Sequence, residues 1–349
     1  MASTVTLKGA NPTPAQTWNH LRINDITLEL PAAPEAPLAA PVAAELAGVR
    51  MVAGDAIVSW LDTNAAERDH IEVEAHTEET LLVEVGDGVA ATDVAVGEGA
   101  RVRIVLVGSP EATGGSVLRV DAAKDAHVEL REVVAAGPEA TFVDATGIRL
   151  DEHASADVRH YALSGRTAVL GFACETAGKH ADYDEVTRYL VQPGCQLDMN
   201  FLARMTGPDT TADLFFSGVL EEGGTKRLAD TIDLVRGAKG AEGHENEVVL
   251  VTGERVHNYA LPSVLCDEED VVGTHGATIG SINEDQRTYL AIRGLDEADA
   301  NALFVRSVFD DALAFVPEAA ETILEAAEAA LGEDAAEELA LAAGIEEED

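Results

Sequence analysis

The chain has 349 residues and a mass of 36.6 kDa, enough to bury a sizeable core in one large domain or two smaller ones. Its 64 acidic residues outnumber its 23 basic residues and give a formal net charge of −41 at pH 7. This charge disfavours nucleic acid and anionic membranes as direct partners, because both require a positive protein surface.

Targeting and cross-linking signals are absent from the sequence. The N-terminal residues MASTVTLKGANPTPAQ lack the apolar core of a signal peptide, and no run reaches the roughly 18 apolar residues of a membrane span. The three cysteines, Cys174, Cys195 and Cys266, are far apart and form no CxxC pair, so we expect no disulfide framework. We therefore expect a soluble, cytoplasmic protein.

Residues 1–50 form a short N-terminal segment and linker. The motif TWNHLRINDITLELP is followed by PAAPEAPLAAPVAAELAG, whose proline and alanine content is typical of a linker. We expect this linker to lead into a short helix.

Residues 51–280 show an alternating, valine-rich pattern punctuated by glycine and aspartate, which predicts strands. A small residue followed by apolar residues two and four places later recurs from Ala100, Ala126 and Cys195, and LDEHASADVRHY is a poorer copy. Strands at this spacing without intervening helices favour a mainly β fold built as a parallel β-helix. An antiparallel sandwich remains an alternative, whereas a doubly wound fold would need alternating helices.

Two glycine-rich segments superficially match phosphate-binding loops. The run from Gly86 to Ala91 follows a strand but precedes another strand, whereas a dinucleotide-binding turn needs a helix to receive the phosphates. In GVLEEGGTKR the lysine of a nucleotide-binding loop is replaced by Gly224, and Lys226 is out of register. We therefore expect a solenoid corner at the first segment and no ATP site in this chain.

Residues 281–349 form a C-terminal helical region. Asn283 with Gln286 predicts a capped helix start, and Asp296 could cap a second helix. We expect helices near 297–315 and 317–331. Their apolar positions at helical spacing include Leu303, Phe304, Val308, Ala312 and Phe315.

The stretch VVGTHGATIG, residues 271–280, places a single histidine among three glycines, at positions 273, 276 and 280. Glycine and β-branched residues disfavour a helix and indicate tight turns or the close approach of another surface. We expect His275 on a turn, either as a ligand or only as a structural group at the end of the domain. Cys266 lies on an expected strand nearby, although a lone cysteine is most often a small buried hydrophobe.

The segment from His257 to Leu313 resembles the C-terminal region of the SufB/SufD family of iron–sulfur cluster assembly subunits. The resemblance is carried by Pro262, by Thr274-His275-Gly276-Ala277-Thr278 with Gly280, and by Arg293-Gly294-Leu295. The N-terminal TWNHLRIND also resembles the Trp-Asn opening of that family.

This resemblance implies a right-handed parallel β-helix between helical ends, and a non-enzymatic scaffold role. The partners implied are the ATPase SufC and a SufB/SufD-like subunit or a second copy, and the cargo is iron or a transient nascent cluster. His275 matches the histidine that SufD-type subunits bring to the subunit interface, and Cys266 is a second candidate ligand. Phe304, Val308 and Phe315 are candidates for docking the ATPase.

Two departures from the family pattern indicate a SufD-like or minimal SufBD protein. Gly273 stands where a cysteine often precedes the histidine, and Arg255 falls near the place of the sulfur-receiving cysteine of SufB-type subunits. The chain is also short, with a reduced N-terminal domain.

Two other functions remain alternatives. One is a β-helix carbohydrate-active enzyme that uses paired carboxylates, although aromatic residues make up only 4% of the chain. The other is a non-catalytic paralogue that only shapes the assembly complex.

Overall fold

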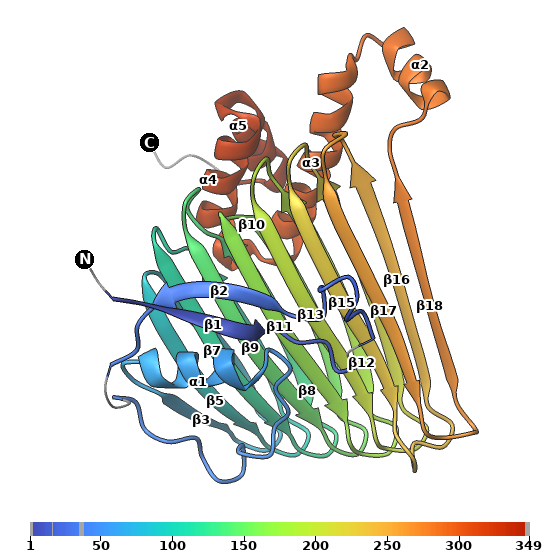
Figure 1. The fold of residues 1–349 in the computed structure, drawn as a ribbon. Helices are drawn as coiled ribbons and strands as arrows, with labels where there is room; N and C mark the ends of the chain where they lie inside the picture. Colours follow the sequence, from blue (N-terminus) through green and yellow to red (C-terminus); the bar gives the residue numbers. More distant parts are fainter. Residues whose placement is uncertain (1–2, 16, 35–37, 346–349) are drawn as a thin grey trace.

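Two parallel β-sheets stacked face to face form most of the molecule (Figure 1). The computed structural model describes residues 3–15, 17–34 and 38–345. Each sheet has eight strands, and successive strands alternate between the sheets, so the chain winds as a β-solenoid. The mainly β fold with a parallel β-helix is thereby confirmed, and the antiparallel sandwich is wrong.

Each coil of the solenoid contributes one strand to each sheet, and the space between the sheets is its lumen. The first sheet contains β3 (Asp69–Val73), β5 (Gly88–Val96), β7 (Thr113–Ala122), β9 (Thr141–Leu150), β11 (Thr167–Thr176), β13 (Gln196–Met205), β15 (Thr225–Leu234) and β17 (His257–Cys266). The second contains β4 (Glu78–Val85), β6 (Arg101–Gly108), β8 (His127–Ala135), β10 (Ser155–Ser164), β12 (Asp182–Val191), β14 (Thr211–Leu220), β16 (Glu242–Val251) and β18 (Val272–Gly280).

The repeated small-apolar unit of the sequence corresponds to lumen-facing positions. The units that begin at Ala100 and Ala126 enter β6 and β8, which are neighbours in one sheet, whereas the unit at Cys195 enters β13 in the other sheet. LDEHASADVRHY is a complete copy, because Ser155 pairs in register with His127 and places Ala156 and Val158 in the lumen. The glycine run from Gly86 is a corner between β4 and β5, as expected.

One corner of each central coil is turned by a residue with left-handed backbone geometry. Asp125, His153, His180 and Asp209 have φ between 56° and 58°, a region in which Asp and His are enriched among non-glycine residues. Each backbone N–H donates to a carbonyl of the following coil, for example from His153 to Lys179 at 2.9 Å. These corners account for the regular punctuation of the valine-rich pattern.

The N-terminal segment packs on the outer face of the first sheet. β1 (Thr4–Ala10) and β2 (Ile26–Pro31) form an antiparallel ribbon. α1 (Asp55–Asn64) is the short helix expected after the linker. Residues 35–37 of the linker lie outside the described residues. Arg227 anchors this segment, because its guanidinium donates to the carbonyls of Asn11 and Asn24 and to the carboxylate of Asp198.

The C-terminal helices cover part of the second sheet. α2 (Glu284–Ile292) and α3 (Glu297–Phe315) begin at the capping boxes of Asn283 and Asp296, as expected, and α4 (Ala320–Leu331) and α5 (Glu333–Ala343) follow. Val308 and Phe309 of α3 pack against apolar side chains of the sheet, including Tyr161. α2 buries no residue and projects beyond the solenoid (Figure 1).

In the described ranges, no helix is both long enough and apolar enough to cross a membrane.

A buried ion cluster crosses the lumen in the middle of the solenoid. His160 is 1% exposed, and its ring nitrogens lie 2.9 Å from Glu185 Oε1 and 3.0 Å from Glu132 Oε2. Burial disfavours the imidazolium, but the carboxylates of Glu185 and Glu132 outweigh it and raise the pKa of His160 to about 10. The cluster is therefore a charged group of three residues, and the rings of Phe172 and Phe201 pack edge-on against its imidazole.

Stability is expected to fall as the pH rises from about 7 to 10. The raised pKa of His160 means that its contribution is complete below the unfolded value of 6.5 and is lost as the pH passes about 10. The loss is on the order of 4 kcal/mol in the free energy of unfolding. Urea titrations at both pH values measure it, with His160→Gln as the neutral comparison. An equal pH dependence in both proteins would contradict this assignment.

Candidate functional site

The last coil, β17 and β18, contains no Asp, Glu, Lys or Arg in its strands, although a quarter of the chain is charged. By contrast, the strands at the opposite end, β3 and β4, contain five acidic residues. Such charges keep the unpaired edge of a sheet from associating with another chain. The strands of the last coil lack this protection, and the acidic residues of that coil lie in the corner at 267–270. Every residue of β18 is exposed except the half-buried Gly276.

The glycine-rich segment is a strand and not a turn. Gly273, Gly276 and Gly280 lie in β18, which pairs in parallel with β16, and none of them has a positive φ. The expectation that His275 lies on a turn is therefore wrong, because small and β-branched residues fit an extended strand equally well. Close approach does apply at Gly273, where a Cβ would lie 2.9 Å from Val264 Cγ1.

His275 lies on the lumen-facing side of the last coil. It pairs in register with Glu245 of β16, whose side chain is buried in the lumen. Because side chains alternate across a strand, the imidazole is on the same face as that carboxylate, one strand spacing away. The His275 side chain is exposed and has no hydrogen bond or ion pair with the described residues.

Cys266 is the last residue of β17 and is exposed, so the buried-hydrophobe reading is wrong for this thiol and correct for Cys174. Its Sγ donates to the carbonyl of Glu268 at 3.1 Å. Cys266 and His275 therefore share the last coil. Among the described residues, however, neither belongs to a group of three His, Cys, Asp or Glu ligand atoms within 4.8 Å of one another. Arg255, near the expected cysteine position, is exposed and pairs with Glu222.

A polar cluster in the penultimate coil, β15 and β16, lies directly below His275. Lys226 is fully buried, and its Nζ binds Glu247, which also accepts a hydrogen bond from the Tyr189 hydroxyl at 3.2 Å. Asp230 and Glu245 complete the cluster at 2% and 5% exposure. These residues belong to no recognised motif, although acidic residues at the inward positions of an alternating strand are a usable signal in the sequence.

Burial and the neighbouring charges shift the pKa values of the groups in this cluster. Burial raises the pKa of Glu245 to about 7, with the nearby Glu247 acting in the same direction. Burial and then Glu245 raise the pKa of Asp230 well above its ordinary value. Burial lowers the pKa of Lys226, against the opposing effect of Glu247. Three carboxyl groups thus lie in a buried region with one ammonium group, which pairs with Glu247.

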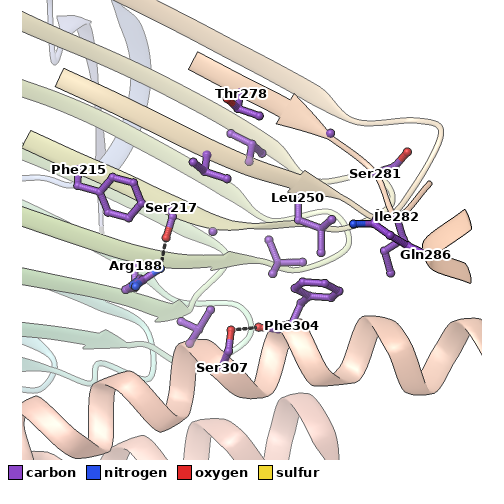
Figure 2. A pocket seen from close by; sticks show the side chains of 16 residues that line it. Arg188, Phe215, Ser217, Leu250, Thr278, Ser281, Ile282, Gln286, Phe304 and Ser307 are labelled. Atoms are coloured by element: carbon purple, nitrogen blue, oxygen red, sulfur yellow. Dashed lines mark hydrogen bonds between the residues drawn. The ribbon is translucent and has the colours of Figure 1, made fainter. Parts of the chain in front are cut away.

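A groove of about 330 Å³ separates α3 from the second sheet near the last coil. Figure 2 shows Phe304 and Ser307 of α3 facing Phe215, Leu250 and the segment after β18. Of the three expected docking residues, Phe304 and Phe315 are 41% and 38% exposed, and Phe315 packs under the Arg159 guanidinium. Val308 is only 4% exposed, because it packs between α3 and the sheet.

Comparison with known proteins identifies a family and several relatives that this chain resembles. The family model described as the SUF system FeS cluster assembly SufBD core domain matches residues 64–308. An iron–sulfur cluster assembly SufBD family protein of Mycobacterium leprae is 25% identical over 200 residues, which are 50% of each chain. A protein of the same description from Mycobacterium bovis is 27% identical over 178 residues, covering 48% of this chain and 44% of the relative.

A third relative is the iron–sulfur cluster assembly protein SufD of Bacillus subtilis, which is 28% identical over 88 residues. That alignment covers 25% of this chain and 20% of the relative. The first two alignments each span about half of the relative's length. The matched family region runs from the end of α1 into α3, and so contains the whole solenoid and His275.

Proposed function

The chain belongs to the SufBD core family of the SUF iron–sulfur cluster assembly system, and from this premise we propose that it is a non-enzymatic scaffold subunit that holds nascent clusters. Iron and sulfur are its cargo, and the ATPase SufC is its partner, because no ATP site is expected in this chain. Family membership favours this role over a carbohydrate-active enzyme.

The observation that carries the proposal is the last coil, whose strands β17 and β18 contain no Asp, Glu, Lys or Arg and whose β18 is exposed, with His275 on its lumen-facing side. An imidazole is a suitable ligand for iron. The neighbouring Gly276 carries no side chain, whereas the space beside Gly273 is already filled by Val264 of the same coil. Cys266 supplies a thiol at the end of the same coil.

A like subunit completes the site. β17 and β18 each pair with a neighbour on one side only, so their outer edges have unpaired N–H and C=O groups. The partner is a SufB/SufD-like subunit or a second copy of this chain, which adds its own edge strands and ligands to those of His275. Because a single imidazole and a single thiol leave most coordination positions of a cluster unfilled, the partner's contribution is necessary.

The ATPase docks on the C-terminal helices. Phe304 is an exposed aromatic residue at the mouth of the groove beside α3, and Phe315 lies at the end of the same helix. Exposed aromatic side chains beside a concave surface are typical anchors of protein interfaces. Val308 supports this surface from below, because it holds α3 against the solenoid.

Substituting His275→Ala is expected to lower the iron content and the visible absorbance of complexes reconstituted with iron, sulfide and partner subunits. The thermal midpoint is expected to stay unchanged, because the imidazole makes no hydrogen bond or ion pair with the described residues. His257→Ala, at an exposed histidine of β17, is the matched control. A lowered midpoint with normal iron loading would show that His275 is structural. Equal cluster loading with and without the chain would refute the scaffold role.

Substituting Thr278→Lys is expected to weaken association between subunits, because it places a charge on the exposed, outward side of β18. Thr80→Lys is the control on β4, an exposed threonine in the edge strand at the other end of the same sheet. Light scattering of this chain, alone and mixed with a SufB/SufD-like subunit, measures the mass of the assembly. Equal association of both variants would exclude this edge as the interface.

Substituting Phe304→Glu is expected to reduce co-purification with SufC by at least about tenfold, which corresponds to roughly 1.4 kcal/mol. Leu341→Ser is the control, because Leu341 is 80% exposed on α5, away from the residues that line the groove. If the Phe304→Glu variant captures SufC as well as the wild type does, the groove is not part of the docking surface.

A further inference from the structure

A histidine and two glutamates meet on the outside of the first coil, at the end of the solenoid opposite the last coil. His70 and Glu72 lie on β3, and both side chains point outward, because Ile71 and Val73 pack into the lumen. Glu45 belongs to the linker before α1. Nε2 of His70 lies 3.6 Å from Oε1 of Glu45 and 3.5 Å from Oε1 of Glu72.

The three side chains have the spacing of metal ligands. One ligand atom from each lies within 4.8 Å of the other two, and no other group of three His, Cys, Asp or Glu in the described part of the chain does so. Three atoms at such separations can all contact one ion at about 2.4 Å or less, near the bond lengths of Zn²⁺ to imidazole and carboxylate. The separations of 3.5 and 3.6 Å exceed those of direct hydrogen bonds. The spacing therefore suits ligands of a shared ion better than a hydrogen-bonded group.

The two glutamates have no cationic partner other than this imidazole among the described residues. Asp93, which is in register with His70 on β5, is instead paired with two arginines, at 3.1 and 3.6 Å. Glu45 is also the single acidic residue between positions 36 and 54, so its place beside His70 does not follow from a local excess of acids. Two carboxylates beside one imidazole repel each other, and a divalent cation between them would remove that repulsion.

The backbone that carries each ligand is already held in place. β3 pairs with β5 along its whole length. Glu45 lies in a turn in which the Leu46 N–H donates to the Ala43 carbonyl at 3.0 Å, and the Leu46 side chain is fully buried. The Arg68 guanidinium, just before β3, donates to the carbonyl of Ala40 at 3.0 Å. The linker and the first strand are thus in contact beside the three ligands, so little ordering is needed for an ion to bind.

We propose that Glu45, His70 and Glu72 form a site for one divalent transition-metal ion, for which Zn²⁺ is the best fit. Imidazole and carboxylate are both ordinary zinc ligands, whereas Mg²⁺ prefers six oxygen ligands and retains its waters. Three protein ligands leave the fourth tetrahedral position to water. The ion joins the linker to β3, an edge strand, and so fastens the N-terminal segment to the first coil. The site does not depend on the proposed function, because His275 lies in the last coil.

The test is calorimetry of the full chain with Zn²⁺, in excess Mg²⁺ to occupy surface acids. The parent protein is Cys266→Ser/His275→Ala, which lacks the candidate ligands of the last coil. This parent is expected to bind one Zn²⁺, and adding either His70→Ala or Glu45→Gln is expected to weaken binding at least about tenfold, because a ligand is lost. The thermal midpoint in EDTA is expected to stay unchanged in both, because both side chains are exposed.

Two substitutions in the same parent serve as matched controls. Glu84→Gln neutralises an exposed glutamate of β4, the edge strand at the same end of the solenoid. His257→Ala removes an exposed histidine of β17 that forms no ion pair with a described carboxylate. Both are expected to leave Zn²⁺ affinity unchanged. A control that weakens binding as much as His70→Ala would show that Zn²⁺ binds diffusely, and would overturn the proposal.

Hydrogen exchange locates the ion in the wild-type chain. Zn²⁺ is expected to slow amide exchange at least about threefold in residues 43–49 and in β3, and to have no such effect there in His70→Ala. Failure of the parent to bind Zn²⁺ would overturn the proposal, and so would undiminished affinity after both His70→Ala and Glu45→Gln. Protection confined to β17 and β18 would place the ion at the last coil and refute the linker site.

Discussion

The parallel, in-register stacking of coils is the constraint on which the rest of this structure depends. Each strand satisfies its backbone N–H and C=O groups only through the coils above and below it. The stack must therefore end in two strands at each end with unpaired edges. At the end formed by β3 and β4, acidic side chains discourage association, whereas β17 and β18 have none. The fold thus leaves one end without this protection on its edge strands, and that end contains His275.

The lumen contains two clusters of buried charged residues, which differ in how their charges are paired. In the middle of the solenoid, His160 lies between Glu132 and Glu185 and is held as a cation, so that cluster has its own counter-charge. Near the open end, Lys226 pairs with Glu247, and neither Asp230 nor Glu245 forms an ion pair with a described Lys, Arg or His side chain. Buried carboxyls that lack a cation are costly, because burial disfavours their charged form. The two clusters differ in position, since one lies in the middle of the solenoid and the other lies one coil below its open end.

The outer faces of the two sheets are covered by different parts of the chain. The N-terminal ribbon and α1 pack on the first sheet and are anchored by the buried Arg227. The C-terminal helices pack on the second sheet, where the Tyr161 hydroxyl donates to Asp311 at 2.9 Å. Neither layer covers the last coil, so its exposure is a consequence of where these layers end.

The sequence alone determined the strand period, the absence of intervening helices, the capped starts of α2 and α3, and the family resemblance carried by residues 257–313, because these depend on local spacing and residue type. It did not reveal that His275 lies on a strand, since glycine-rich, β-branched segments suit turns and edge strands alike. Only the tertiary structure decided that Glu245 lies below His275, that Asp230 faces it from the other sheet, and that Val308 is buried. Those relations join residues from different coils and layers, and coil stacking and helix packing set them, not local sequence.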